Sequence, residues 1–178
     1  LFENDIIKLG EKSITTGYPD GGFHPLESIE RGAMAAYLYR LAGSPEFEAP
    51  AESPFSDVPT THPFYKEIAW LKATGITTGW EDGTFRPEES INREAMAAFF
   101  YRAAGSPEVQ QKATFTDVSG SPFVKEISWF QFSKLSTGWP DSTFRPHDSV
   151  KRDAMAAYMM RYMGNFDSVK VSVPAPAK

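Results

Sequence analysis

Three arginines recur at the same place in a repeated motif. Arg31, Arg93 and Arg152 each open an apolar, alanine-rich segment that is predicted to be a helix. A cation at a helix start faces the positive end of the helix dipole, so its recurrence there needs another reason. A guanidinium presents a planar fork that matches a carboxylate or a phosphate. The arginines are therefore candidate anion-binding residues, and an internal ion pair with an aspartate of the repeat is the alternative.

Aromatic residues recur in the loop that precedes each arginine. Tyr18, Trp80 and Trp139 each follow a loop glycine. Such a side chain either plugs the core or offers a flat face to the C–H surface of a sugar. Phe85 and its equivalents already supply the predicted core plug, so the preceding aromatic residue is a candidate sugar platform.

The acidic residues of the repeats could either bind a ligand or stabilise turns. Asp57 and Asp117 begin the first helical unit of their repeats and are candidates for ligand binding or for capping a turn. The loop aspartates are predicted mainly to form turns; they are Asp20, Asp82 and Asp141. One aspartate per loop does not supply the oxygen ligands of a calcium site. The three histidines do not share one repeat position, so no metal or other cofactor is expected.

The elements that must position these residues come from an internal repeat. Residues 17–43 and 79–105 agree at 17 of 27 positions, and residues 138–164 agree with the second copy at 15 of 27, as counted on the sequence. The first copy lacks a counterpart of Phe55-Ser-Asp57-Val, so the chain is predicted to start inside a repeat, as a fragment or processed form. The predicted divisions are repeat 1 at 1–52, repeat 2 at 53–112, repeat 3 at 113–166, and a Pro/Ala linker or tail at 167–178.

Each repeat is predicted to form a helix, a loop and a second helix. In the second copy the apolar spacing places these helices at about 63–74 and 91–104. Trp70 and Trp129, on the first helices, are predicted to lie at the edge of the core or to pack between repeats. Glycines are predicted to end the second helices; they are Gly43, Gly105 and Gly164. The predicted fold is all-α, with three helix-loop-helix repeats in a pseudo-threefold, three-lobed arrangement around a central helix bundle.

Composition excludes several functions. The chain has 178 residues, a net charge of −5 and no cysteine. The negative charge argues against a duplex nucleic-acid surface. No apolar run approaches the ~18 residues that a membrane span needs. The absence of cysteine excludes disulfides and thiolate chemistry. Aspartates that occur once in every repeat do not look like the unique carboxylate pair of a glycosidase, so no enzymatic activity is expected.

Several motifs together resemble those of the S-layer homology domain family, over about residues 1–165. These are Phe-x-Asp-Val, Gly-[aromatic]-x-Asp-Gly-x-Phe-x-Pro, and a Thr-Arg-Ala-Glu-type motif that opens an apolar helix. Here the last motif is Ile29-Glu30-Arg31-Gly32-Ala33, Ile91-Asn92-Arg93-Glu94-Ala95 and Val150-Lys151-Arg152-Asp153-Ala154. Only its arginine matches in all three copies. The following Met-Ala-Ala is similar to actinobacterial members of the family.

The resemblance implies a function outside the cell, at the cell wall or S-layer. Such modules anchor a surface protein noncovalently to a secondary cell-wall polysaccharide linked to peptidoglycan. The implied ligand is a pyruvylated amino sugar, held in grooves between neighbouring repeats. One alternative is a self-assembly module whose lobes contact lattice neighbours. Another is a glycan-active enzyme. The predicted ligand-binding residues are Arg31, Arg93, Arg152, Tyr18, Trp80, Trp139, Asp57 and Asp117.

The resemblance also implies that the grooves differ. Each groove would combine the arginine of one repeat with the opening segment of the next, so that Arg31 meets the segment at Asp57, and Arg93 meets the segment at Asp117. Arg152 would need the missing opening of repeat 1, which leaves two complete sites and one defective site. The residues that precede the arginines add a charge difference: Glu30 repels an anion, Asn92 is neutral and Lys151 attracts one. The Arg93 groove is therefore expected to be the best.

Overall fold

A computed structural model describes residues 2–175, which form six helices and no strand beyond isolated bridges. The all-α prediction is confirmed. Each repeat contributes a short first helix and a longer second helix. The first helices are α1 (Glu3–Glu11), α3 (Tyr65–Ala73) and α5 (Val124–Phe132). The second helices are α2 (Arg31–Leu41), α4 (Arg93–Ala103) and α6 (Arg152–Phe166).

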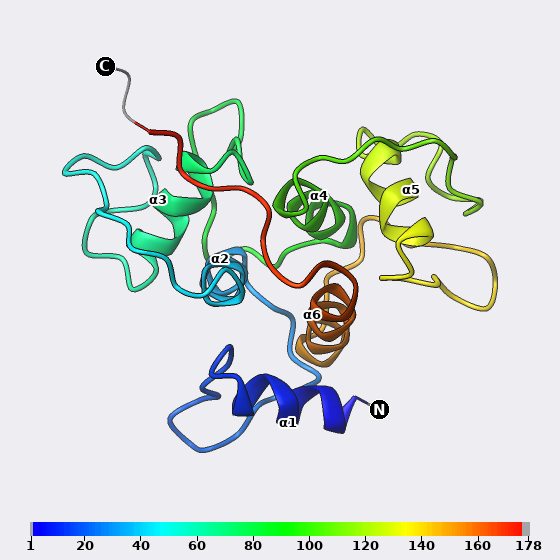
Figure 1. Ribbon diagram of the computed structural model, residues 1–178, viewed down its shortest axis with the longest axis horizontal. Helices are drawn as coiled ribbons and strands as arrows, with labels where there is room; N and C mark the ends of the chain where they lie inside the picture. Colours follow the sequence, from blue (N-terminus) through cyan, green and yellow to red (C-terminus); the bar gives the residue numbers. More distant parts are fainter. Residues whose placement is uncertain (1, 176–178) are drawn as a thin grey trace.

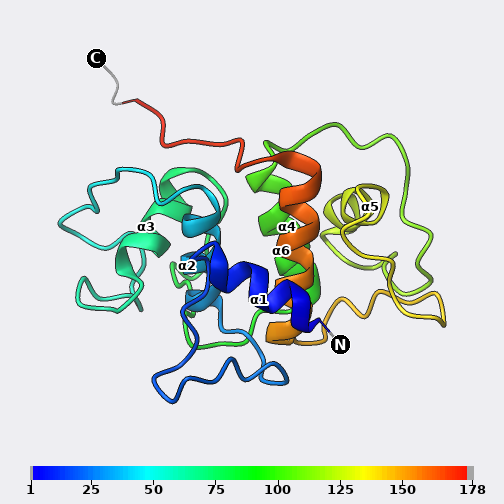
Figure 2. The same cartoon turned by 60° about the horizontal axis from the view of Figure 1, so that its bottom comes forward.

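The second helix of each repeat packs on the first helix of the following repeat. The pairs are α2 with α3, α4 with α5, and α6 with α1. Figure 1 shows α2, α4 and α6 almost end-on near the centre, with α1, α3 and α5 further out. In Figure 2, α4 and α6 run side by side. Because the helices pair across repeats, no repeat in the described chain has a helix pair of its own, and the repeat boundaries stay predictions.

Aromatic side chains join two of these helix pairs. The ring centroids of Tyr39 and Trp70 lie 5.4 Å apart, and those of Tyr101 and Trp129 lie 5.6 Å apart, both edge to face. Trp70 and Trp129 are buried, and each meets a tyrosine of the preceding repeat. The prediction that these tryptophans pack between repeats is confirmed.

A ring of backbone hydrogen bonds joins the three repeats just before the second helices begin. Ile29 N–H donates to Val150, Val150 N–H to Ile91, and Ile91 N–H back to Ile29, at 2.9–3.0 Å. All three side chains are buried. The next hydrogen bonds are also shared between repeats, since the N–H of Arg31 donates to the carbonyl of Glu89. The start of every second helix is thus completed by another repeat.

The ends of the second helices follow the glycine prediction in two repeats and depart from it in the third. Gly43 and Gly105 adopt positive φ of 83° and 84° just after their helices. Gly164 lies inside α6, so its predicted role as a helix end is wrong. Ser-Pro follows the first two glycines and disfavours further helix, whereas Asn-Phe follows Gly164. The extra turn brings Phe166 onto Trp129, with ring centroids 5.4 Å apart.

Candidate functional site

The three recurrent arginines are buried at the starts of the second helices. Arg31, Arg93 and Arg152 are 6%, 7% and 6% exposed. Each is the first residue of its helix, and each reaches into the loop of the next repeat. The guanidinium Nε donates in every case to the carbonyl of a loop phenylalanine. The acceptors are Phe85 for Arg31 (2.8 Å), Phe144 for Arg93 (2.6 Å) and Phe23 for Arg152 (2.8 Å).

Asp57 fixes the loop that receives Arg31. Its two carboxylate oxygens accept the backbone N–H groups of Phe85 (2.8 Å) and Arg86 (2.7 Å). Asp117 holds the loop of repeat 3 in the same way, with two bonds of 2.8 Å. The structure therefore places both aspartates behind the loops, where they aim the phenylalanine carbonyl at the arginine. The Phe85 plug is confirmed, since its side chain is fully buried.

The arginines have no acidic partner in residues 2–175. No carboxylate oxygen lies within 4.0 Å of the guanidinium of Arg31, Arg93 or Arg152. The alternative of an internal ion pair is therefore wrong for this part of the chain. Burial lowers the pKa of Arg31 to about 10, while the charges of Glu89 and Asp57 act in the opposite direction. A buried cation without a counter-ion is stabilised by an anionic ligand that reaches it.

The loop aromatic residues lie beside these arginines and remain exposed. Trp80, Trp139 and Tyr18 are 45%, 43% and 37% exposed. The guanidinium carbon of Arg31 lies 5.7 Å from the ring centre of Trp80, and that of Arg152 lies 4.7 Å from Tyr18. These distances suit cation–π contacts, which hold an exposed ring in a fixed orientation. Arg93 and Trp139 line one cavity, so each recurrent arginine shares a site with a loop aromatic residue of the following repeat.

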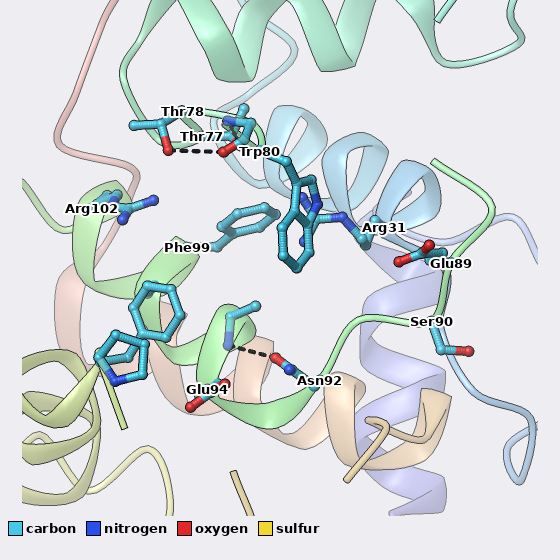
Figure 3. A pocket seen from close by; sticks show the side chains of 15 residues that line it. Arg31, Thr77, Thr78, Trp80, Glu89, Ser90, Asn92, Glu94, Phe99 and Arg102 are labelled. Carbon is cyan, nitrogen blue, oxygen red and sulfur yellow. Dashed lines mark hydrogen bonds between the residues drawn. The ribbon is translucent and has the colours of Figure 1, made fainter. Parts of the chain in front are cut away.

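Three cavities form around these pairs, and each takes residues from all three repeats. We name them the Arg31, Arg93 and Arg152 grooves; their volumes are about 390, 290 and 260 Å³. The Arg31 groove is lined by Arg31, Trp80, Asn92, Phe99, Arg102 and Phe123, among others. Figure 3 shows Trp80 beside Arg31, with Phe99 next to them and Arg102 further along α4.

The other two grooves are built from the equivalent positions. The Arg93 groove is lined by Arg93, Ser136, Trp139, Tyr158, Arg161 and Phe2. The Arg152 groove is lined by Arg152, Thr15, Tyr18, Tyr37, Arg40 and Phe64, with Glu30 at its edge. Each groove is completed by the phenylalanine that precedes a first helix of the remaining repeat: Phe123 in the Arg31 groove, Phe2 in the Arg93 groove and Phe64 in the Arg152 groove. The Arg152 groove forms without any described opening segment in repeat 1, because the equivalent residues 55–58 and 115–118 line none of the three cavities.

The three grooves carry different charges, but the residue that precedes each arginine does not set the charge around that arginine in the way that the sequence had suggested. Asn92 lines the Arg31 groove and Glu30 lines the Arg152 groove. Glu30 and Asn92 thus face a different groove from the arginine that follows each of them, and Lys151 lines none of the three grooves. The reason is local: Glu30 and Asn92 are helix caps with extended backbone, where successive side chains point to opposite sides. The neutral Asn92 is therefore no reason to favour the Arg93 groove.

Another feature does set the Arg93 groove apart. Among its described lining residues it has two arginines, Arg93 and Arg161, and no acid. The Arg31 groove contains Glu89 and Glu94, and the Arg152 groove contains Glu30. Arg93 is also held firmly, since its Nη1 donates to the hydroxyl of Tyr158 at 2.7 Å.

Two recurrent positions escaped the sequence reasoning. One is a hydroxyl residue two places before the loop glycine; Thr15, Thr77 and Ser136 are buried there and accept the glycine N–H. The other is an arginine near the end of each second helix, a place where a cation complements the helix dipole. Arg40, Arg102 and Arg161 also donate to loop carbonyls of their own repeats at 2.8–3.1 Å and line the grooves. Their recurrence in all three copies was the available signal.

Comparison with known proteins agrees with this architecture. The family model described as "S-layer homology domain" matches residues 2–35, 54–97 and 114–156. The chain belongs to the S-layer homology domain family. It is 32% identical over 157 residues to "Cell surface glycoprotein 1" of Acetivibrio thermocellus, covering 82% of this chain and 7% of that protein. It is 31% identical over 152 residues to the "Cellulosome-anchoring protein" of the same organism, covering 82% of this chain and 34% of that protein.

A third relative is also a longer surface protein that this chain matches over part of its length. The "S-layer protein EA1" of Bacillus anthracis is 28% identical over 135 residues, covering 75% of this chain and 15% of that protein. The chain thus spans about a third or less of the length of these three relatives. Together the family and the relatives indicate an extracellular location at the cell surface or cell wall and support cell-surface anchoring. Among the described residues, no helix has the length and apolar character to cross a membrane.

Proposed function

We propose that this chain anchors a surface protein noncovalently to the cell envelope by binding a secondary cell-wall polysaccharide. The bound group is an anionic sugar, such as a pyruvylated amino sugar, and it enters the grooves. One observation carries the proposal: each groove is lined by a buried arginine that has no acidic partner in residues 2–175 and by an exposed aromatic ring.

The groove chemistry fits an acidic sugar on two counts. Arg93 offers a guanidinium to a carboxylate in a partly desolvated place, where a charged hydrogen bond is stronger than in water. Trp139 offers its face to the C–H surface of a pyranose ring. The two groups line one cavity of about 290 Å³, the right order of size for one or two sugar rings. Asp57 and Asp117 position the loops in this proposal and do not touch the ligand.

The comparisons favour anchoring over catalysis. The family is a non-catalytic anchoring module, and one relative is named a cellulosome-anchoring protein. We extend that role to this chain. The proposal needs no cofactor, because the arginines themselves supply the positive charge.

The Arg93 groove is proposed to bind the sugar most tightly. It has two cations and no acid among its described lining residues, so an anion meets no repulsion there. The Tyr158 hydroxyl also holds the guanidinium in place before the ligand arrives, which reduces the ordering cost of binding.

Calorimetry with a pyruvylated N-acetylamino-sugar glycoside tests this function. The unmodified chain should bind the sugar, and the same glycoside without the pyruvyl group should bind far more weakly. Arg93→Ala should weaken binding by about 2 kcal/mol, more than Arg31→Ala or Arg152→Ala. Lys112→Ala, outside the grooves, is the matched control. Arg93→Lys keeps a cation and tests whether the fork geometry is needed.

Three outcomes would overturn the proposal. These are equal binding of both glycosides, binding to neither, or an Arg93→Ala variant that binds normally. Oligomers that form without any sugar, seen by sedimentation, would favour the self-assembly alternative. Release of reducing ends from wall polysaccharide would favour an enzyme.

A further inference from the structure

The second cation of each aromatic loop differs between repeats. In repeats 2 and 3 it is an arginine, whose guanidinium carbon lies 4.0 Å from the ring centre of the loop tryptophan. Arg86 lies over Trp80 and Arg145 over Trp139. Repeat 1 has His24 at this position, with its ring centroid 4.3 Å from that of Tyr18. Only the cation of repeat 1 can therefore lose its charge near neutral pH.

His24 lies between two carboxylates. Its Nε2 is 2.7 Å from Asp20, and its Nδ1 is 2.9 Å from Glu27. A neutral imidazole has one N–H, so it can donate to only one of them, and its other nitrogen would face a carboxylate oxygen. The observed geometry satisfies both acids only when the ring carries two protons. The hydrogen bonds to Glu27 and then Asp20 raise the pKa of His24 above its ordinary value.

The cluster connects His24 to the anion-binding arginine. Glu27 also accepts the hydroxyl of Tyr18 at 3.2 Å, and its backbone carbonyl accepts the N–H of Arg152 at 2.9 Å. Arg152 in turn lies 4.7 Å from the Tyr18 ring. The charged and titratable groups that face His24 are thus Asp20, Glu27 and Tyr18 from its own loop, and Arg152 from α6. When His24 loses its proton, two negative charges beside the groove lose their counter-ion.

We propose that the Arg152 groove is a proton-dependent anion site, in which His24 is the switch. This inference rests on the proposed function of the grooves. Protonated His24 balances Asp20 and Glu27 and holds the Tyr18 ring in place. Neutral His24 leaves the carboxylates uncompensated, so the groove repels an anionic sugar and its aromatic wall loosens. The loop cations of repeats 2 and 3 are Arg86 and Arg145, which stay charged near neutral pH, so those loops lack this switch.

The chain offers a matched pair of variants. Arg86 and Arg145 have φ of 59° and 58°, close to the 54° of His24, so His24→Arg fits the backbone and makes repeat 1 like the others. Arg86→His makes the reverse change. Its acids are Asp82 at 3.1 Å and Glu89 at 4.0 Å, in the places that Asp20 and Glu27 occupy in repeat 1. The variants therefore move the switch between grooves without touching Arg31 or Arg152.

Groove-resolved NMR titration with the pyruvylated glycoside tests the inference at about pH 5.5 and about pH 9, on either side of the His24 transition. Shifts of Tyr18, Trp80 and Trp139 report the three grooves separately. We expect the affinity at Tyr18 to fall about two- to fivefold at the higher pH, the scale of an exposed ion pair. Little change is expected at Trp139, because the described lining of its groove contains no histidine and no acid. His24→Arg should remove the fall, and Arg86→His should create one at Trp80.

The outcomes separate this inference from the function on which it rests. Binding that is independent of pH at Tyr18, or that falls equally in all three grooves, overturns the switch and leaves sugar binding intact. A pH effect that survives in His24→Arg also overturns it. No binding in any groove at either pH overturns the proposed function together with the switch.

Discussion

The loops of repeats 1 and 2 share one shape and similar internal side-chain contacts, but among the described residues only the loop of repeat 2 is also held from outside. Residues 17–25 and 79–87 close with the same backbone hydrogen bond, Tyr18 N–H to Gly22 and Trp80 N–H to Thr84, both 2.8 Å. The loop of repeat 2 is held from outside by Asp57, which belongs to the opening segment of its repeat. Repeat 1 has no described counterpart of that segment, and its loop is held from within by His24 and its two acids.

The two clamps are expected to contribute differently to the stability of their loops. The outside clamp joins residues 28 positions apart and satisfies two partly buried backbone N–H groups of the loop. The inside clamp joins exposed, titratable side chains within one loop. Exposed pairs contribute little, whereas a missing partner for a buried backbone N–H is costly. The loop of repeat 1 should therefore be the more adjustable of the two, although its groove has the same plan.

The largest effect is expected when the neighbours of repeat 1 are removed. A chain that ends at Ser106 loses α6, which is the packing partner of α1 and the source of Arg152. It also loses the two backbone hydrogen bonds of Val150, which leaves only the bond between Ile91 and Ile29 from the ring that joins the repeats. We expect no cooperative melt by circular dichroism and an aggregated or molten product. A chain that ends at Val171 is the control and should melt like the whole chain. A sharp melt of the shorter fragment would contradict a shared core.

The loop glycines should differ strongly between the repeats. Gly79 has φ of +74°, and a Cβ there would overlap the Phe55 ring and approach the carbonyl of Thr84 to 2.9 Å. Gly79→Ala should cost about 4 kcal/mol, from the left-handed backbone and the overlap together. Gly17 has similar φ of +70° but meets only the carbonyl of Gly22, at 3.0 Å. Gly17→Ala should cost about 1 kcal/mol. Equal costs in urea unfolding would show that the outside clamp does not tighten repeat 2.

Removing the outside clamp itself should have an intermediate effect. Asp57→Ala leaves the N–H groups of Phe85 and Arg86 without their acceptor, and the unfolding free energy should fall by about 2 kcal/mol. Asp57→Asn retains one carbonyl acceptor and should recover part of the loss. Asp20→Ala, in the exposed loop of repeat 1, is the comparison and should change much less. An Asp20→Ala loss as large as that of Asp57→Ala would reverse the proposed roles of the two clamps.

The smallest effect is a pH dependence confined to repeat 1. Hydrogen bonds to Glu27 and Asp20 raise the pKa of His24. A raised folded-state pKa contributes stability below the unfolded value of about 6.5, and that stability is lost as pH rises through the folded pKa. The melting temperature should thus fall slightly more between about pH 6 and about pH 9 in the unmodified chain than in His24→Arg. Parallel curves for the two chains would show that His24 does not stabilise the loop.

Below neutral pH, the stability of both loops should depend on pH in the same direction. Hydrogen bonds from Thr84 and Arg86 lower the pKa of Asp82 to about 2, and a backbone bond from Gly22 followed by His24 lowers the pKa of Asp20. A lowered pKa contributes stability above the unfolded value, and this stability is lost as pH falls. The two loops therefore differ only above neutral pH, where the arginines stay charged and His24 does not.

The sequence alone determined the repeats, the helical fold and the identity of the key side chains. Apolar spacing located α3 and α4 to within about two residues at each end. The Phe85 plug, the inter-repeat tryptophans and two of three glycine stops were also readable, because each depends on local periodicity or on turn chemistry. Recurrence at fixed positions singled out Arg31 and Trp80 as candidates, and the structure showed that they lie together. The third stop failed because aromatic packing at Phe166 overrode the glycine.

Only the tertiary structure decided which repeat supplies which wall of a groove. Every second helix pairs with the next repeat, and every cavity combines three repeats, so neighbours in sequence are not neighbours in a groove. Asn92 faces a different groove from Arg93 because an extended cap reverses the side-chain direction at each residue. The absence of acid partners around the arginines, within residues 2–175, was likewise invisible in a sequence rich in aspartate and glutamate. Charge in a groove depends on distances across repeats, and periodicity along one chain does not contain them.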